Sequence, residues 1–147
     1  MERKTSERLH RINYLMAETD ALYHRAALQL GISDSAMLVL YTVYDYGEGC
    51  LLSNVYHLSG ASKQTVNSAV RKLEREDILY LKPDGRGKRI YLTQKGKRYA
   101  EQTAGRLYAT ECNALATWTD AEIDSYLFLM EKYAQSLREQ IAKDAHV

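Results

Sequence analysis

The chain has 147 residues, of which 46% are apolar and 27% charged, with 20 basic and 19 acidic side chains. This composition excludes a disordered chain, and the length allows a core that folds without a metal or a disulfide. The two cysteines, Cys50 and Cys112, are far apart and have no neighbouring His/Cys cluster, so we expect neither a disulfide scaffold nor a zinc site. The N-terminus lacks the apolar run of a signal peptide, and the longest apolar stretch is too short for a membrane span. We therefore expect a cytoplasmic protein that has no membrane partner.

The charge is unevenly distributed along the chain. Between Lys63 and Arg98, eleven basic residues stand against four acidic ones, a net charge of +7, so the rest of the chain carries −6. This asymmetry is expected when one face of a protein meets a polyanion. A solvated basic surface explains the same composition, so charge alone leaves both interpretations open.

The first two predicted elements are helices. Apolar residues between Leu9 and Leu30 step alternately by three and four positions, which predicts a long amphipathic helix ended by Gly31. Ser33 and Asp34 are candidate N-caps for a second, mostly buried helix that stops at glycines 47 and 49.

A short helix is predicted next, at residues 53–58, and Ser62 then caps a helix with two different faces. The apolar face consists of Val66, Ala69, Val70 and Leu73. The polar face consists of Lys63, Gln64, Asn67, Ser68, Arg71 and Lys72. We expect the apolar face to anchor this helix and the polar face to point outward.

The hydrophobic period then changes from 3.6 to 2. Residues 78–82 and 89–93 favour β structure and are separated by turn residues 83–88, which predicts a hairpin. Thr93 can cap a further helix that extends to about Cys112. Thr119 and Asp120 open a last helix, with Glu122 completing a capping box and an apolar stripe that continues to Ile141.

A short helix, a turn, a polar-faced helix and a basic hairpin, in this order, predict a winged helix-turn-helix within residues 34–98. In such a domain the second helix enters the major groove and the hairpin, or wing, reaches the flanking DNA. The predicted DNA contacts of the recognition helix are Ser62, Lys63, Gln64, Thr65, Asn67, Ser68, Arg71 and Lys72, and those of the wing are Asp84, Arg86, Lys88 and Arg89. Gln64, Asn67, Ser68 and Arg71 offer donors and acceptors for base edges, whereas Lys63 and Lys72 suit phosphates.

The segment from Ser62 to Gly96, SKQTVNSAVRKLEREDILYLKPDGRGKRIYLTQKG, resembles the MarR-type winged-helix transcription regulators. The likeness covers the recognition helix, a D-x-R wing (Asp84, Arg86) and a terminal L-T-x-x-G (Leu92, Thr93, Gly96). It implies that Arg86 probes the minor groove while Asp84 orients it. In two places the sequence departs from the family pattern. Asp77 stands where a glycine is usual, although aspartate tolerates a left-handed cap less well, and the wing is short, with Leu81 where a basic residue is frequent.

The resemblance also implies a homodimer, because the family pairs its first and last helices into a dimerisation domain. Both ends of this chain carry long apolar stripes, at residues 6–30 and 119–143, with residues 99–112 joining them. The predicted interface residues are Leu9, Ile12, Met16, Leu127, Leu137 and Ile141. The alternative is that these stripes form the core of a monomer.

The predicted fold is thus mainly α with a small β-hairpin wing. The predicted function is that of a homodimeric, sequence-specific regulator of transcription that binds a pseudo-palindromic site in duplex DNA and represses. The alternatives are a winged-helix protein-interaction module and a redox sensor that uses Cys50 or Cys112. No catalytic motif, metal-ligand spacing or cofactor-binding loop is present in the sequence, so we expect neither an enzyme nor a cofactor.

The predicted first two helices carry Tyr14, Tyr23, Tyr41 and Tyr44. In proteins of this resemblance these helices wall a crevice that takes small aromatic or anionic molecules, which implies a ligand that relieves repression. Core or interface tyrosines explain the same residues equally well, so no ligand-binding residue is assigned.

Overall fold

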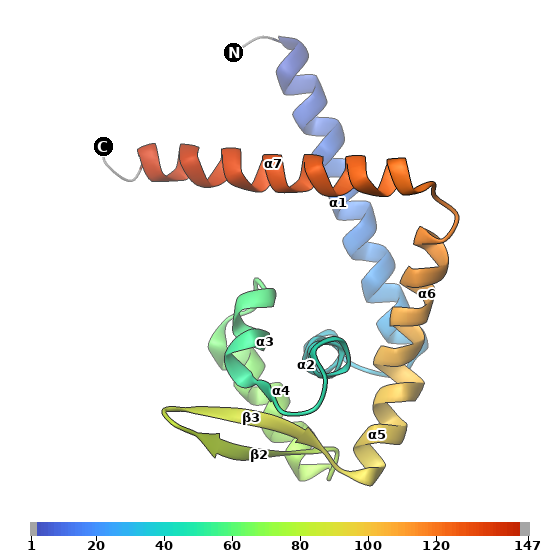
Figure 1. Ribbon diagram of the computed structural model, residues 1–147, viewed down its shortest axis with the longest axis vertical. Helices are drawn as coiled ribbons and strands as arrows, with labels where there is room; N and C mark the ends of the chain where they lie inside the picture. Colours follow the sequence, from blue (N-terminus) through green and yellow to red (C-terminus); the bar gives the residue numbers. More distant parts are fainter. Residues whose placement is uncertain (1–2, 145–147) are drawn as a thin grey trace. The chain divides into compact units, whose positions relative to one another are not determined.

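The computed structural model describes residues 3–144 and is mainly helical with one small antiparallel sheet (Figure 1). The helices are α1 (Arg3–Gln29), α2 (Asp34–Tyr46), α3 (Leu52–Leu58), α4 (Lys63–Arg75), α5 (Gln94–Ala100), the π-helix η1 (Glu101–Gly105), α6 (Arg106–Leu115) and α7 (Asp120–Asp144). The strands are β1 (Cys50–Leu51), β2 (Leu79–Asp84) and β3 (Gly87–Leu92), in the order β1-β3-β2. The predicted fold class is confirmed. The chain forms two compact units, one up to Tyr108 and one from Ala109.

Polar side chains begin the helices where the sequence predicts them. The hydroxyls of Ser33, Ser62 and Thr93 accept backbone N–H groups in the first turns of α2, α4 and α5. In the second unit, the Thr119 N–H donates to the Glu122 carboxylate at 2.8 Å, and the Glu122 N–H donates to the Thr119 hydroxyl at 3.3 Å. The Thr119 N–H and the Thr119 hydroxyl, which also donates to the Glu122 carboxylate at 2.9 Å, lower the pKa of the Glu122 carboxyl. The predicted capping box is confirmed.

The core of the first unit lies between α2, α4 and the sheet. Its most completely buried large side chains are Leu40, Leu73, Ile90, Val39, Val43, Val55 and Val66. The predicted inner face of α4 is confirmed, because Val66, Ala69, Val70 and Leu73 are all buried. Burial of this apolar face anchors the helix to the body of the unit.

The hairpin differs from its prediction in length. Residues 83–88 were expected to form a loop, but both strands continue and only Gly85 and Arg86 form the turn. Pro83 lies within β2 and pairs with Lys88. A proline fits there because β2 is an edge strand, where one backbone N–H has no sheet partner. Gly85 has a φ of 56°, which glycine adopts without strain.

Two further elements were not predicted. The strand β1 adds to β3 through the pairs Cys50–Ile90 and Leu51–Arg89. The helical stretch after Thr93 was expected to end near Cys112 but reaches Leu115, and it contains the π-helix η1. Gly105, at the end of η1, faces the Tyr44 ring so closely that an added Cβ would lie 3.0 Å from it.

The end of α4 is a Schellman motif centred on Asp77. The Ile78 N–H donates to the Leu73 carbonyl at 2.9 Å, the Asp77 N–H donates to the Glu74 carbonyl at 3.0 Å, and Asp77 has a φ of 58°. Thr93 and Lys95, at the start of α5, also bond to the residues that end α4. The Thr93 hydroxyl donates to the Asp77 carbonyl at 2.6 Å, and Lys95 Nζ donates to the Glu76 carbonyl, also at 2.6 Å. The N-terminus of α5 thus holds the C-terminus of α4, even though an aspartate occupies the left-handed position.

Replacing Asp77 by glycine is expected to raise the free energy of unfolding by about 0.5 to 1 kcal/mol, because glycine adopts positive φ freely. Urea denaturation at fixed protein concentration measures the change. The neighbouring Glu76→Gly variant is the control, since Glu76 has a φ of −83° and glycine should destabilise there. A loss of stability in Asp77→Gly equal to that of the control would contradict the assignment of strain to Asp77.

Within residues 3–144, no single helix is both long and apolar enough to cross a membrane. Among the described residues, α1 and α2 taken together pass the test of length and composition, across a bend of 93°.

Candidate nucleic-acid interface

The outer face of α4 is a continuous polar surface. Lys63, Gln64, Ser68, Arg71 and Lys72 are exposed, and Asn67 is partly buried. The predicted residues Ser62 and Thr65 cap the N-terminus of α4. The Ser62 hydroxyl accepts the Thr65 N–H at 3.1 Å and lies 3.0 Å from the Thr65 hydroxyl. The exposed base-reading and phosphate-binding candidates therefore share one side of a rigidly capped helix.

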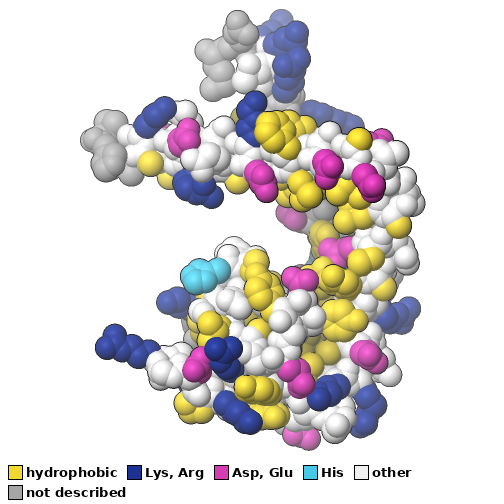
Figure 2. All heavy atoms as spheres, viewed as in Figure 1, with side chains coloured by type: hydrophobic (Ala, Val, Ile, Leu, Met, Phe, Trp, Pro, Cys, Tyr) yellow, Lys and Arg dark blue, Asp and Glu magenta, His cyan; other side chains and the backbone are white. Residues whose placement is uncertain are grey.

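The hairpin carries its charges on the side and at the tip. In Figure 2, basic side chains project from the hairpin tip, where the turn residue Arg86 and its near neighbour Lys88 are exposed. Asp84 Oδ2 lies 2.9 Å from Arg89 Nε, and Arg89 also donates to the Gly49 carbonyl at 2.8 Å. The resemblance implied that Asp84 orients Arg86, but the ion pair is with Arg89. Arg89 is thereby tied to the body of the unit, which leaves Arg86 and Lys88 as the outward cations of the turn.

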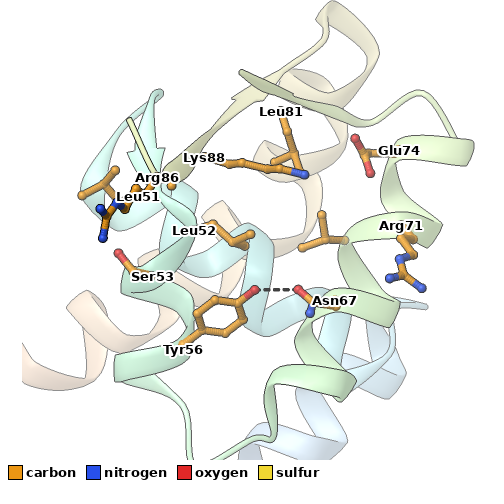
Figure 3. A pocket seen from close by; sticks show the side chains of 12 residues that line it. Leu51, Leu52, Ser53, Tyr56, Asn67, Arg71, Glu74, Leu81, Arg86 and Lys88 are labelled. Carbon is orange, nitrogen blue, oxygen red and sulfur yellow. Dashed lines mark hydrogen bonds between the residues drawn. The ribbon is translucent and has the colours of Figure 1, made fainter. Parts of the chain in front are cut away.

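A groove of about 400 Å³ lies between α3, α4 and the hairpin (Figure 3). Its polar lining consists of Ser53, Tyr56, Asn67, Arg71, Glu74, Arg86 and Lys88, and its apolar lining includes Leu51, Leu52, Val70 and Leu81. The structure thus brings the predicted recognition residues Asn67 and Arg71 to the same groove as the predicted wing residues Arg86 and Lys88. The three cations outnumber the single carboxylate of Glu74, so the groove favours anionic groups.

Tyr56 is a groove residue that the sequence did not reveal. Its hydroxyl donates to Asn67 Oδ1 at 2.6 Å, and Lys63 Nζ lies 5.5 Å from the centre of its ring. A single tyrosine of α3 therefore contacts two predicted DNA contacts of α4. Tyr56 is the one tyrosine of α3, but only the packing of α3 on α4 shows that it contacts the recognition residues.

The outer face of the hairpin carries a second aromatic group. The Tyr80 and Tyr91 rings stack with their centres 5.6 Å apart, and Lys82 Nζ lies 4.8 Å from the Tyr91 ring centre. This arrangement offsets the repulsion between Lys82 and Arg89, which are directly paired across the strands. The cluster stiffens the wing behind its basic tip.

The two cysteines differ in environment. Cys50 is buried in β1, and burial raises the pKa of its thiol, an effect that Arg89 partly opposes. A buried thiol with a raised pKa is poorly suited to redox sensing, which requires an accessible thiolate. Cys112 is exposed.

The tyrosines singled out in the sequence are found in two settings. Tyr41 and Tyr44 of α2 pack against Tyr108, with ring centres 6.0 and 5.6 Å apart. Tyr14 and Tyr23 are exposed on α1. The first pair is thus part of an aromatic cluster within the first unit.

No protein-family model and no curated protein matches this sequence. Solved structures do match. A MarR family regulator from Neisseria meningitidis superposes with a TM-score of 0.82 at 18% identity, over 93% of this chain and 98% of that one.

The other similar structures include a DNA complex of MepR from S. aureus, with a TM-score of 0.65 at 20% identity over 87% of this chain and 96% of that one. BpsR of Bordetella bronchiseptica, whose DNA binding is regulated by 6-hydroxynicotinic acid, has a TM-score of 0.62 at 18% identity over 84% of this chain and 98% of that one. Taken together with the two-faced α4 and the basic hairpin, these superpositions show that the chain has the winged helix-turn-helix fold of MarR family transcription regulators.

Proposed function

We propose that this protein is a sequence-specific, double-stranded DNA-binding regulator of transcription that acts in the cytoplasm and represses by occupying a promoter. The observation that carries the proposal is the two-faced helix α4. Its apolar side is buried, and its polar side lies open beside a wing with two outward cations, Arg86 and Lys88. A helix held in this way can enter a major groove while the wing contacts the flanking backbone. The MepR complex supports the proposal because a protein of the same fold binds DNA.

We further propose that the DNA-binding part is residues 34–98 and that a second copy pairs with residues 6–30, 99–112 and 119–143. Two sets of exposed apolar side chains support this. On α1 the set includes Leu9, Ile12 and Met16, and on α7 it includes Leu127, Leu137 and Ile141. None of the residues of α7 is buried within the chain. A helix that buries none of its apolar side chains gains little stability from packing within its own chain. Burial of these side chains against a partner subunit would supply that stability.

Two-fold symmetry of the dimer predicts a pseudo-palindromic site with half-site centres about 10 base pairs apart. Selection of bound sequences from random duplex DNA with the purified protein tests this. Enrichment of a symmetric motif supports the regulator. Absence of any enriched motif would overturn it in favour of a module that binds another protein.

The recognition helix and the wing should respond differently to mutation. If Arg71 makes a bidentate base contact, Arg71→Ala is expected to weaken binding by about 1 to 3 kcal/mol and to relax the preference at one base pair. Lys88→Ala should weaken binding to all sequences similarly, because a phosphate contact carries no sequence information. Fluorescence anisotropy on the selected site and its single-base variants separates the two patterns. Equal, sequence-independent losses from both changes would indicate a nonspecific DNA binder.

We also propose that a small aromatic or anionic ligand relieves repression. The control of BpsR by 6-hydroxynicotinic acid supports this by analogy of fold, and the cluster of Tyr41, Tyr44 and Tyr108 supplies aromatic surface beside η1. A ligand would act by shifting the population of dimers between DNA-competent and incompetent states. Candidate aromatic acids that leave DNA affinity unchanged at saturating concentration would count against this mode of control.

A further inference from the structure

Tyr56 and Asn67 form a side-chain hydrogen bond within the groove between α3, α4 and the hairpin. The Tyr56 hydroxyl donates to Asn67 Oδ1 at 2.6 Å, and both side chains are partly buried (Figure 3). Asn67 lies one turn after Lys63 and one turn before Arg71 on the outer side of α4. The bond therefore fixes a polar side chain in the middle of the helix face that meets DNA.

This bond determines which end of the Asn67 amide remains available. An asparagine carries an acceptor, Oδ1, and a two-proton donor, Nδ2. The familiar recognition of adenine by asparagine needs both ends at the base edge, with Oδ1 accepting from N6 and Nδ2 donating to N7. Here Oδ1 is turned toward Tyr56 of the protein, so Nδ2 is the end left to approach a base.

Tyr56 also limits the movement of a neighbouring side chain. Lys63 Nζ lies 5.5 Å from the centre of the Tyr56 ring, a distance at which an ammonium group is attracted to the ring face. The same ring thus lies beside a phosphate-binding candidate, while its hydroxyl holds a base-reading candidate. Such pre-positioning reduces the side-chain entropy that is lost when DNA binds.

We propose that Tyr56 is a positioning residue that sets base specificity by holding Asn67 as a donor. This inference rests on the proposed function of DNA binding. With Nδ2 outward, the base that Asn67 reads is one with adjacent acceptors in the major groove. Guanine offers two, N7 and O6, whereas adenine presents a donor, N6, beside its N7 acceptor. The position of the half-site read by Asn67 therefore favours guanine over adenine.

The test compares sequence selection by the wild type, Tyr56→Phe, Asn67→Ala and the double variant. The wild type should enrich guanine at one position of each half-site, and Asn67→Ala should erase that enrichment. Tyr56→Phe frees Oδ1 and should reduce the guanine-over-adenine ratio of affinities at that position roughly 3- to 10-fold, with the other positions unchanged. In the Asn67→Ala background, Tyr56→Phe should have no further effect on this ratio.

Tyr46→Phe is the matched control, because it removes a tyrosine hydroxyl from the exposed end of α2, away from the groove. Its ratio of affinities should equal that of the wild type. If Tyr56→Phe lowers affinity for guanine and adenine sites by the same factor, or leaves both unchanged, the positioning role is overturned while the proposed function stands. A wild type that enriches no motif overturns the proposed function itself.

Discussion

Replacing Gly96 by alanine is expected to lower the free energy of unfolding by about 4 kcal/mol or more, a size of effect that few single substitutions reach. A Cβ at this position would lie 1.7 Å from the Ile78 carbonyl oxygen and 2.8 Å from its carbon, both backbone atoms. Relief requires α5 to move away from the end of α4. That movement breaks the hydrogen bond from the Thr93 N–H to the Ile78 carbonyl, which measures 3.0 Å.

Urea and thermal denaturation of Gly96→Ala measure this loss. Gly60→Ala is the matched control, because no atom would lie within 4 Å of its new Cβ and its backbone does not have positive φ. We expect the control to stay within about 1 kcal/mol of the wild type. A Gly96→Ala variant as stable as this control would mean that α5 does not approach Ile78 this closely. The glycine of the L-T-x-x-G segment thus has a physical explanation, a close contact between backbones.

Local signals explain how much of the fold was predictable from the sequence. The helix starts were predictable, because a cap depends on hydrogen bonds within one turn. The expected helices do begin at Ser33, Ser62, Thr93 and Thr119. The inner face of α4 was equally predictable from its period. The strand β1 was not, since a two-residue strand has no period and exists only by pairing with β3.

The hairpin shows how tertiary position overrides a local signal. Pro83 and Gly85 both indicate a loop, yet Pro83 lies in a strand because the edge of the sheet tolerates it. The same strand extension changes the partner of Asp84. In the observed register Asp84 pairs with Gly87, and the alternation of side chains puts Arg89 diagonally opposite on the same face. The family resemblance implied Arg86 as the partner instead, because a sequence motif contains no information about strand register.

In the candidate site, too, the features that depend on local sequence were predictable and those that depend on tertiary packing were not. Helical period alone places Asn67 and Arg71 on the outer side of α4, and the structure agrees. The contact between Asn67 and Tyr56 joins residues eleven positions apart on two helices, so it depends on how α3 packs against α4. Sequence reasoning found the side chains that face outward, but it could not find the neighbour that orients one of them.

Truncating the inner face of α4 by Leu73→Ala is expected to cost about 2 to 5 kcal/mol of unfolding free energy. Leu73 is 1% exposed, and its carbonyl accepts the Ile78 N–H that ends the helix. Removing its side chain leaves a cavity between α4 and the core, but it leaves the outer face intact. The variant should therefore unfold at lower urea concentration, yet bind DNA with near wild-type affinity at temperatures where it remains folded.

Denaturation should be compared at one protein concentration, because dimerisation would make the midpoint depend on it. Leu58→Ala is the matched control, since the same side chain is removed at the end of α3 where Leu58 is 53% exposed. We expect the control to lose less than about 1 kcal/mol. If Leu73→Ala loses no more than Leu58→Ala, the apolar side of α4 does not anchor it, and the outward direction of its polar side would lose its physical basis.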